Sequence, residues 1–443
     1  MERRTRAELL DLGNQLRQRV PHSEHATWTK ELRTADPLQL LRRQEQGRVP
    51  ELLPLRYSRM ATSPFAFYRG SAAAMASDLA HAPATGINVQ ACGDAHAENF
   101  GAYASPERNV VYDVNDFDET LPAPWELDVK RLAASLVLGG REAGLDDSSA
   151  RAQAEIAVHA YSGALSSLLE MTTIDIHYSH LEGDSYLATI GDPKVHKAVQ
   201  EYLDKARRRT NQQAMRKWTE MRNGALRFRE EPPILQRLTD QEVERLHDRY
   251  NSYRQTLQVN RQRLLEQYRF RDAAHRVVGV GSVGLRSYVL LLEGRGEPDP
   301  LFIQLKQAVT SVLTPYWGPS GYSTHGERVV AGQRIMQAAS DPFLGWETVD
   351  GDFYVRQLRD MKGPSSYSQE LSVLESGAAL VGATLARSHS RSVDPSLLVG
   401  YVGQGTSFAA AIAQFASDYA DQAERDYGEF IAAIKSGSFP TAG

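Results

Sequence analysis

The sequence predicts an α+β protein in which a small β-rich lobe is set within a larger helical lobe. Helical periodicity dominates residues 1–90 and returns after residue 363. Residues 275–307 and 352–358 instead carry dense apolar runs bounded by glycine-rich turns, which is typical of buried strands. A chain of 443 residues is also too long for one small core and suggests roughly two to four lobes or domains.

Composition indicates an ordinary folded globular protein, with 42% apolar and 24% charged residues. The net charge of −5 gives no reason to expect nucleic acid or an anionic membrane surface as a partner. The single cysteine, Cys92, allows no internal disulfide, and the arginine-rich start has no apolar signal region. No segment reaches the ~20 apolar residues that span a bilayer. We therefore expect a reduced, cytoplasmic protein.

Residues 194–222 and 235–268 read as long, strongly charged helices with few large apolar residues, so we expect peripheral or connecting helices. Short β-rich runs lie between residues 88 and 120, before a helix that begins near Pro124. The expected organisation is an N-terminal helical extension (1–50), a large helical lobe with connecting helices (51–270), a small β-rich lobe (271–362) and C-terminal helices completing the large lobe (363–443).

Two neighbouring segments, CGDAHAENFG and VYDVNDFDET, concentrate acidic and amide side chains after β-like runs. Hard oxygen ligands of this kind suit Mg²⁺ or Mn²⁺. Asp94 and Asn99 have the spacing of the catalytic-loop Asp and the metal-binding Asn of kinases. We therefore predict that Asp94 positions or deprotonates an acceptor hydroxyl, and that Asn99 and Asp116 bind the metal. Further candidates in or near this cluster are Asp118, Asp113, His96 and Arg69.

Other interpretations of these segments stay open. A polar turn can place carboxylates on helix ends and backbone amides without any ligand. A metal-dependent hydrolase would use His96 with the acids, and His389 in ARSHSRS is the candidate second histidine. Arg69 follows three aromatic residues, where it either contacts phosphate or forms a structural ion pair.

The segment GVGSVG carries Gly279, Gly281, Ser282 and Gly284, a G-x-G-x-x-G triplet that alone is a weak signal. The strand-like residues that follow it fit a kinase glycine-rich loop better than a dinucleotide-binding turn, which leads into a helix. A tight β-turn without a ligand is the alternative.

Lys306 ends the next apolar strand, PLFIQLKQA, where a buried ammonium needs a partner. Phosphate oxygens and Glu327, which opens the following helix, are the predicted partners, with Gln333 as another polar group on that helix. Gln357 and Leu358 end a later strand, and we expect backbone groups there to form an interlobe hinge that holds an adenine.

Several of these motifs resemble known kinases. CGDAHAENFG resembles the HGDxHxxN loop of aminoglycoside phosphotransferases and choline kinases, and VNDFDET resembles their IDFxxA metal segment. PWELDVKRLAASL resembles the helix whose Asp, here Asp128, steadies that loop, and ALVGATLARSHSRS resembles the helix that precedes it. The motifs as a set, from about residue 50 to about 430, also resemble the bacterial domain of unknown function 2252.

The resemblance has departures. Cys92 replaces the loop histidine. The loop between Asn99 and Asp116 is longer than usual, so Asp113 is a second candidate for the metal ligand; we prefer Asp116, because Phe117 follows it as in the family motif. The glycine turn and Lys306 follow the acidic loop instead of preceding it. The resemblance therefore implies a circularly permuted, protein-kinase-like two-lobe fold, with the charged helices at 194–268 joining the old ends.

The resulting expectation is an ATP- and Mg²⁺-dependent phosphotransferase, with Mn²⁺ as an alternative metal and a small-molecule or protein hydroxyl as acceptor. Two further readings of a kinase-like fold remain, a nucleotide-binding pseudokinase and an AMP-transferring enzyme. A metal-dependent hydrolase is the alternative from another class.

Overall fold

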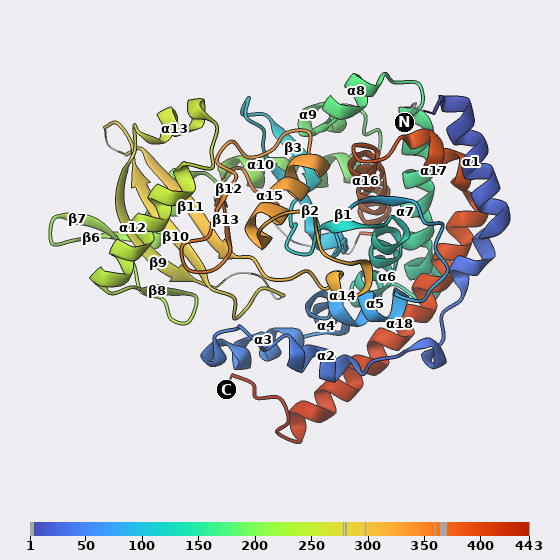
Figure 1. The fold of residues 1–443 in the computed structure, drawn as a ribbon, viewed down its shortest axis with the longest axis horizontal. Helices are drawn as coiled ribbons and strands as arrows, with labels where there is room; N and C mark the ends of the chain where they lie inside the picture. The colour runs from blue at the N-terminus through green and yellow to red at the C-terminus, as the bar shows by residue number, and fades with distance from the viewer. Residues whose placement is uncertain are drawn as a thin grey trace.

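Two lobes make up the computed structural model, which describes residues 4–277, 279, 281–296, 298–358, 360–363 and 370–442. Figure 1 shows a twisted sheet at one end of the molecule and a group of long helices at the other. Helices and antiparallel sheets both contribute, so the predicted α+β class is confirmed.

The small lobe is built on a six-stranded antiparallel sheet with strand order β12-β13-β11-β10-β9-β8. Successive residues of the central strands face opposite sides: Leu292 and Ile303 join one apolar cluster, while Leu291 and Phe302 join another. Both faces are covered, which explains the unbroken apolar runs in the sequence. The strands are β8 (Leu235–Arg237), β9 (Arg269–Arg276), β10 (Ser287–Glu293), β11 (Pro300–Gln307), β12 (Gly345–Glu347) and β13 (Phe353–Gln357).

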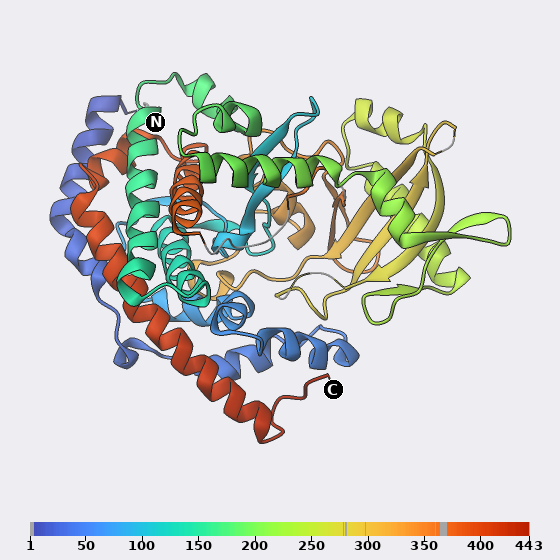
Figure 2. The ribbon, with the colours of Figure 1, turned by 180° about the vertical axis from the view of Figure 1, so that it is seen from behind.

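The sheet lobe begins earlier than the expected boundary at 271. Helix α12 (Asp240–Arg254) buries Leu246, Tyr250 and Tyr253 in the cluster on one face of the sheet. On the other face, α11 (Asn211–Trp218) packs Trp218 edge-on against Phe302. The charged segment at 235–268, which we expected to be a long peripheral or connecting helix, instead contains β8, α12 and α13 (Val259–Leu265), and α12 covers one face of the sheet. Helix α10 (Pro193–Arg208) leads from the long helices towards the sheet (Figure 2).

The large lobe buries Trp125 and Tyr161 in a stacked pair at its centre. Helix α16, from the C-terminal part of the chain, packs against α7 and α6. The N-terminal helix α1 packs along α17, so this part of the expected N-terminal extension belongs to the large lobe. The long helices are α1 (Arg6–Arg19), α6 (Glu126–Glu142), α7 (Asp147–Leu168), α16 (Leu371–Ser390), α17 (Pro395–Val402) and α18 (Thr406–Lys435).

The remaining elements are short, and several of them line or anchor the site described below. Among the described residues no single helix is long and apolar enough to cross a bilayer; α17 and α18 pass that test only as a pair bent by 83°. The short helices are α2 (Pro37–Arg43), α3 (Leu53–Met60), α4 (Pro64–Gly70), α5 (Ala72–Leu79), α8 (Thr173–Tyr178), α9 (Gly183–Leu187), α13 (Val259–Leu265), α14 (Thr314–Trp317) and α15 (His325–Met336). The short strands are β1 (Asn88–Ala91), β2 (Phe100–Ala104), β3 (Val110–Val114), β4 (Leu121–Pro124), β5 (Leu181–Glu182), β6 (Thr219–Arg222) and β7 (Ala225–Phe228).

A glycine sets how closely α16 approaches α7. A Cβ atom at Gly382 would lie 2.0 Å from the carbonyl oxygen of Ala157, whereas a Cβ at Gly377 on the same helix meets nothing within 4 Å. We expect Gly382→Ala to destabilise the protein by about 1–3 kcal/mol through overpacking. Gly377→Ala is expected to stabilise it by up to about 1 kcal/mol, because alanine favours the helix. Urea unfolding of the two variants measures both; equal effects would contradict the close packing.

Candidate active site

The acidic loop follows β1 and is held from below by a buried carboxylate. Asp128, in the first turn of α6, accepts hydrogen bonds from the backbone N–H groups of Cys92 (2.6 Å) and Gly93 (2.9 Å). Asp128 also lies 3.2 Å from Nε2 of His389 on α16, whose Nδ1 lies 2.9 Å from the Tyr161 hydroxyl. The loop-steadying contact implied for Asp128 is therefore confirmed.

Asp94 is fixed by Arg131, whose Nε donates a hydrogen bond of 2.9 Å to Oδ1 and whose Nη2 forms an ion pair with the same oxygen at 2.7 Å. Burial raises the pKa of Asp94, and Arg131 opposes that rise. The side-chain amide of Asn99 donates to the Asp94 carbonyl at 2.7 Å, which closes the loop on itself. His96 lies 3.8 Å from the other Asp94 oxygen, and burial lowers its pKa well below the usual range, so its ring is neutral.

Asp116 lies at the point where the acidic segment meets the small lobe. Burial opposes its charge, but Lys306, Arg356 and Lys362 outweigh burial and lower the pKa of Asp116 to about 2. One carboxylate oxygen, Oδ1, is buried and has no hydrogen-bond partner within the described part of the chain. An ionised oxygen in that position is suited to receive a cation.

Lys306 of β11 is 2% exposed and forms an ion pair with Asp118, which also accepts a hydrogen bond of 2.9 Å from the Tyr354 hydroxyl. Burial disfavours the ammonium, yet Asp116 and Asp118 together raise the pKa of Lys306. The lysine of the small lobe thus reaches the acidic segment of the large lobe, although the two are 188 residues apart.

The expected pairing of Lys306 with Glu327 is wrong. Glu327 lies in the first turn of α15, and its carboxylate accepts a hydrogen bond from the backbone N–H of Ser323 at 3.1 Å. A glutamate at that position caps its own helix. The neighbouring Arg328 instead ties α15 to the acidic segment by donating to the carbonyl oxygens of Thr120 (2.6 Å) and Asp118 (2.8 Å).

Gln333, the other polar group considered on α15, donates to Gln337 at 2.9 Å.

The glycine turn lies over the acidic loop. Gly279, Gly281 and Ser282 line one cavity together with Asp94, His96, Asn99, Asp116 and Asp118. Gly279 and Gly284 have φ values of +69° and +91°, which glycine adopts without strain. Gly284 does not line this cavity: its carbonyl accepts from Val49 N–H at 2.7 Å, and Arg48 packs over it.

The backbone N–H groups of Gln357 and Leu358, where we expected an adenine to be held, both donate hydrogen bonds within the protein. The backbone N–H of Gln357 donates to the Asp341 carboxylate at 2.5 Å, and that of Leu358 donates to the Phe302 carbonyl at 3.0 Å. Neither amide is left to bind a base. Both residues line a second cavity, of about 270 Å³, on the other side of Asp116.

Two further candidates are resolved by their contacts. Asp113 accepts hydrogen bonds from Val114 N–H (2.9 Å) and the Ser388 hydroxyl (3.1 Å), so it anchors α16 instead of lining the cavity. Arg69 lines the cavity and forms an ion pair with Glu98 at 2.6 Å, which matches the structural ion pair that was one of its two predicted roles.

Sequence reasoning missed other groups on the cavity wall. Arg56, from α3, is fully buried, and its Nε and Nη1 atoms have no hydrogen-bond partner among the residues described. Burial raises the pKa of Glu119 to about 7, although Val312 N–H donates to it at 2.7 Å. Glu119 directly follows DFD within the quoted acidic segment, which was the signal for it, whereas Arg56 and Arg131 look like ordinary helix residues in the sequence.

The donor set fits Mg²⁺ only in partnership with a ligand. Within the described ranges, no group of three or more His, Cys, Asp and Glu side chains could hold a metal ion by itself. Asp116 offers one free carboxylate oxygen beside Asn99, while Asp118 is bound to Lys306. Mg²⁺ is commonly held by one or two carboxylates, with waters and substrate phosphates completing its shell.

Comparison with known proteins places the chain by family. No curated protein and no solved structure matches it. The family model described as "Uncharacterized protein conserved in bacteria (DUF2252)" matches residues 48–433, a span that includes the acidic loop, the glycine turn and Lys306. Since this match covers most of the sequence, the chain belongs to the bacterial DUF2252 family.

Proposed function

We propose that the protein is an ATP- and Mg²⁺-dependent phosphotransferase that acts on a hydroxyl group of a small-molecule acceptor. One observation carries the proposal: the glycine turn, which is distant in sequence, lines one cavity with Asp94, Asn99 and Asp116. Phosphoryl transfer depends on groups that hold phosphates and metal beside a carboxylate that orients the nucleophile.

The order of elements in the small lobe supports a kinase-like interpretation. A glycine turn joins β9 to β10, Lys306 ends β11, and α15 follows before β12 and β13. Kinases likewise have a glycine-rich loop, then a strand lysine, then a helix. Here Asp94 precedes the small lobe in the sequence. His389, which follows that lobe, contacts the Asp128 carboxylate that holds the Asp94 loop, and this order favours circular permutation.

Each residue has a defined part in this proposal. Asp94, held by Arg131, orients the acceptor hydroxyl. Its fixed position contributes more to the rate than its basicity does. Asp116 and Asn99 hold Mg²⁺, which when bound neutralises charge on the phosphate oxygens. Lys306 exchanges its contact with Asp118 for phosphate oxygens, and Arg56 adds a further cation on the wall of the cavity that Asp118 lines.

Transfer of AMP is the second candidate, and the hydrogen bonds at the interlobe strand favour it. The amides of Gln357 and Leu358 are both occupied, so the adenine is not held there as in the expected hinge. If the nucleotide binds in the reverse direction, with its base away from this strand, its α-phosphorus would lie nearer Asp94 and AMP would be transferred.

The test is to incubate the purified full chain with ATP and Mg²⁺, with water or its own hydroxyls as acceptors, and identify the products by mass. ADP indicates phosphoryl transfer, and AMP with pyrophosphate, or AMP-modified protein, indicates AMP transfer. Asp94→Asn is expected to slow turnover about 100-fold or more. Lys306→Met is expected to weaken ATP binding.

Glu327→Gln is the matched control, because it keeps the helix cap and leaves turnover unchanged. If the protein binds ATP without turnover, and Asp94→Asn leaves that binding unaltered, the protein is a pseudokinase. Ester hydrolysis that needs no ATP and survives Lys306→Met would identify a metal-dependent hydrolase.

A further inference from the structure

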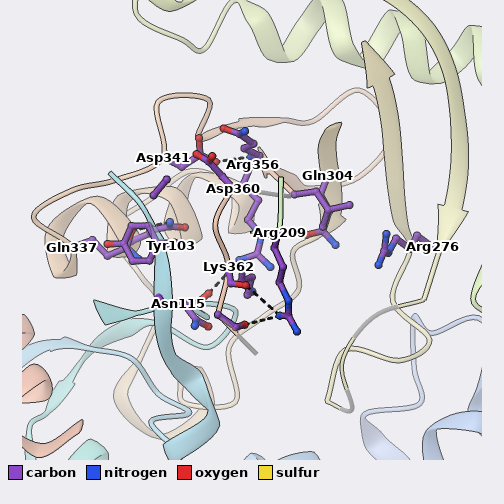
Figure 3. Close-up of a pocket in the computed structure, with 16 residues that line it drawn as sticks. Tyr103, Asn115, Arg209, Arg276, Gln304, Gln337, Asp341, Arg356, Asp360 and Lys362 are labelled. Carbon is purple, nitrogen blue, oxygen red and sulfur yellow. Dashed lines mark hydrogen bonds between the residues drawn. The ribbon is translucent and has the colours of Figure 1, made fainter. Parts of the chain in front are cut away.

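The second cavity, between the small lobe and β2, is lined by basic side chains from four separate segments. Arg276 ends β9, Arg356 lies on β13, Arg209 follows α10, and Lys362 follows β13 by five residues. Figure 3 labels these four side chains among those that line the cavity, with Arg276 set apart from the other three. Basic side chains from four segments around one partly buried cavity suit an anionic ligand, because guanidinium and ammonium groups match its charge.

The acidic side chains on the same wall do not cancel this charge. Asp341 is committed to the backbone N–H groups of Phe343 (2.8 Å) and Gln357 (2.5 Å), and burial raises its pKa to about 6. Asp360 pairs with Arg108 at 2.5 Å, which brings a further positive charge with it. Asp116, which does not line this cavity, also faces Arg356 and Lys362. The wall itself still carries four basic side chains against two acidic ones.

Neutral oxygens orient two of the arginines. One nitrogen of Arg209 donates to the carbonyls of Lys362 (3.2 Å) and Gly363 (2.8 Å). Arg356 donates to the Gln304 side-chain oxygen at 3.2 Å and to the Asn115 carbonyl at 3.3 Å. These contacts fix the guanidinium groups without neutralising them.

A hydroxyl on the same wall is also available. The Tyr103 hydroxyl is buried and has no hydrogen-bond partner in the part of the chain that the structure describes. A buried hydroxyl without a partner is costly, and it can donate to an oxyanion.

The backbone along this cavity is closed to a nucleobase. Besides the amides of Gln357 and Leu358, that of Met361 donates to the Arg209 carbonyl (3.1 Å) and that of Gly363 to the Ala102 carbonyl (2.8 Å). A neutral ring would also leave the guanidinium groups desolvated without compensation. Guanidinium groups match phosphate oxygens in both charge and geometry.

We propose that this basic interlobe cavity, defined by Arg209, Arg276, Arg356 and Lys362, binds phosphate groups of a ligand. The phosphates come from one of two sources: the outer phosphates of a nucleotide that enters phosphate-first, or a second, phosphorylated molecule. Asn115 on the cavity wall directly precedes Asp116, so the bound phosphates lie beside the proposed transfer centre. Binding in this cavity does not depend on the proposed transfer reaction.

The test measures binding of inorganic tripolyphosphate to the full chain by calorimetry, with a chelator present so that no metal contributes. Arg209→Gln and Arg276→Gln are each expected to weaken binding by about 10-fold or more, as loss of a charge-assisted hydrogen bond predicts. Arg208→Gln is the matched control, since Arg208 neighbours Arg209 and is exposed. Thermal melting checks that each variant is folded, and the two arginines lie on different segments in case one variant is not.

The proposal would be overturned if Arg208→Gln weakened tripolyphosphate binding as much as the two cavity variants do. It would also be overturned if only Lys306→Met abolished that binding. Competition then distinguishes the two sources. If tripolyphosphate displaces ATP and Arg209→Gln weakens ATP, the nucleotide supplies the phosphates; if both ligands bind together, a second phosphorylated molecule does. Tripolyphosphate binding and ATP turnover are measured separately. If Asp94→Asn abolishes turnover but binds tripolyphosphate as the unaltered protein does, phosphate binding in this cavity does not depend on the proposed reaction.

Discussion

Turnover of ATP with Mg²⁺ is expected to fall by about 1000-fold when Asp116 is replaced by asparagine. The ionised Asp116 carboxylate faces Lys306, Arg356 and Lys362, and its Oδ1 atom is the free oxygen of the proposed metal site. The substitution removes the charge that binds the cation and leaves the basic groups facing one another. Loss of such electrostatic stabilisation costs several kcal/mol of transition-state binding.

The measurement is kcat and KM for ATP over a range of Mg²⁺ concentrations, where Asp116→Asn should also raise the Mg²⁺ requirement. Asp113→Asn is the control, because Asp113 contacts Val114 and Ser388 and not the cavity. It is expected to lower stability and leave kcat nearly unchanged. If Asp113→Asn abolished turnover and Asp116→Asn did not, the assignment of the metal ligand would be wrong.

The parts of the site that could be predicted are those encoded by local spacing. Asp94 and Asn99 belong to one loop, so their separation in sequence fixes their proximity whatever the rest of the chain does. Gly279 and Gly281 likewise form one turn. That these segments share a cavity depends on how the lobes pack, and here the prediction rested on resemblance.

The partner of Lys306 could not be predicted in the same way. A helix following the lysine strand suggested Glu327, but a glutamate in a first turn competes for its own helix cap, and that local contact formed instead. Asp118 reaches Lys306 across 188 residues, a contact with no local signature.

The packing of the charged helix α12 against the sheet was also difficult to predict. Leu246, Tyr250 and Tyr253 are spaced to lie on one face of α12, and two of the three are tyrosines, which a count of aliphatic residues overlooks. The amides of Gln357 and Leu358 illustrate a second limit. Whether a backbone N–H is free depends on neighbours such as Asp341, which no pattern around it reveals.

Replacement of Asp128 by alanine is expected to destabilise the protein by about 3–5 kcal/mol, a large share of the stability of a typical domain. Asp128 is 1% exposed, and its removal leaves the backbone N–H groups of Cys92 and Gly93 and the His389 ring without their acceptor. Buried donors that lose a charged acceptor keep their full desolvation cost. Asp128→Asn retains one acceptor oxygen and should cost less.

Asp147→Ala is the matched comparison, because Asp147 also lies in a helix's first turn but is 86% exposed, with its surface pair to Arg141 worth less than about 1 kcal/mol. Urea unfolding of both variants gives the difference. A double-mutant cycle with His389→Ala should show coupling, since both residues belong to one buried chain of contacts. Equal, small losses in the two aspartate variants would mean that the acidic loop keeps its shape without Asp128. The position of Asp94 would then have to be explained by its own contact with Arg131 and by the hydrogen bond from Ala97 N–H to the Ser135 hydroxyl, which also join the loop to α6.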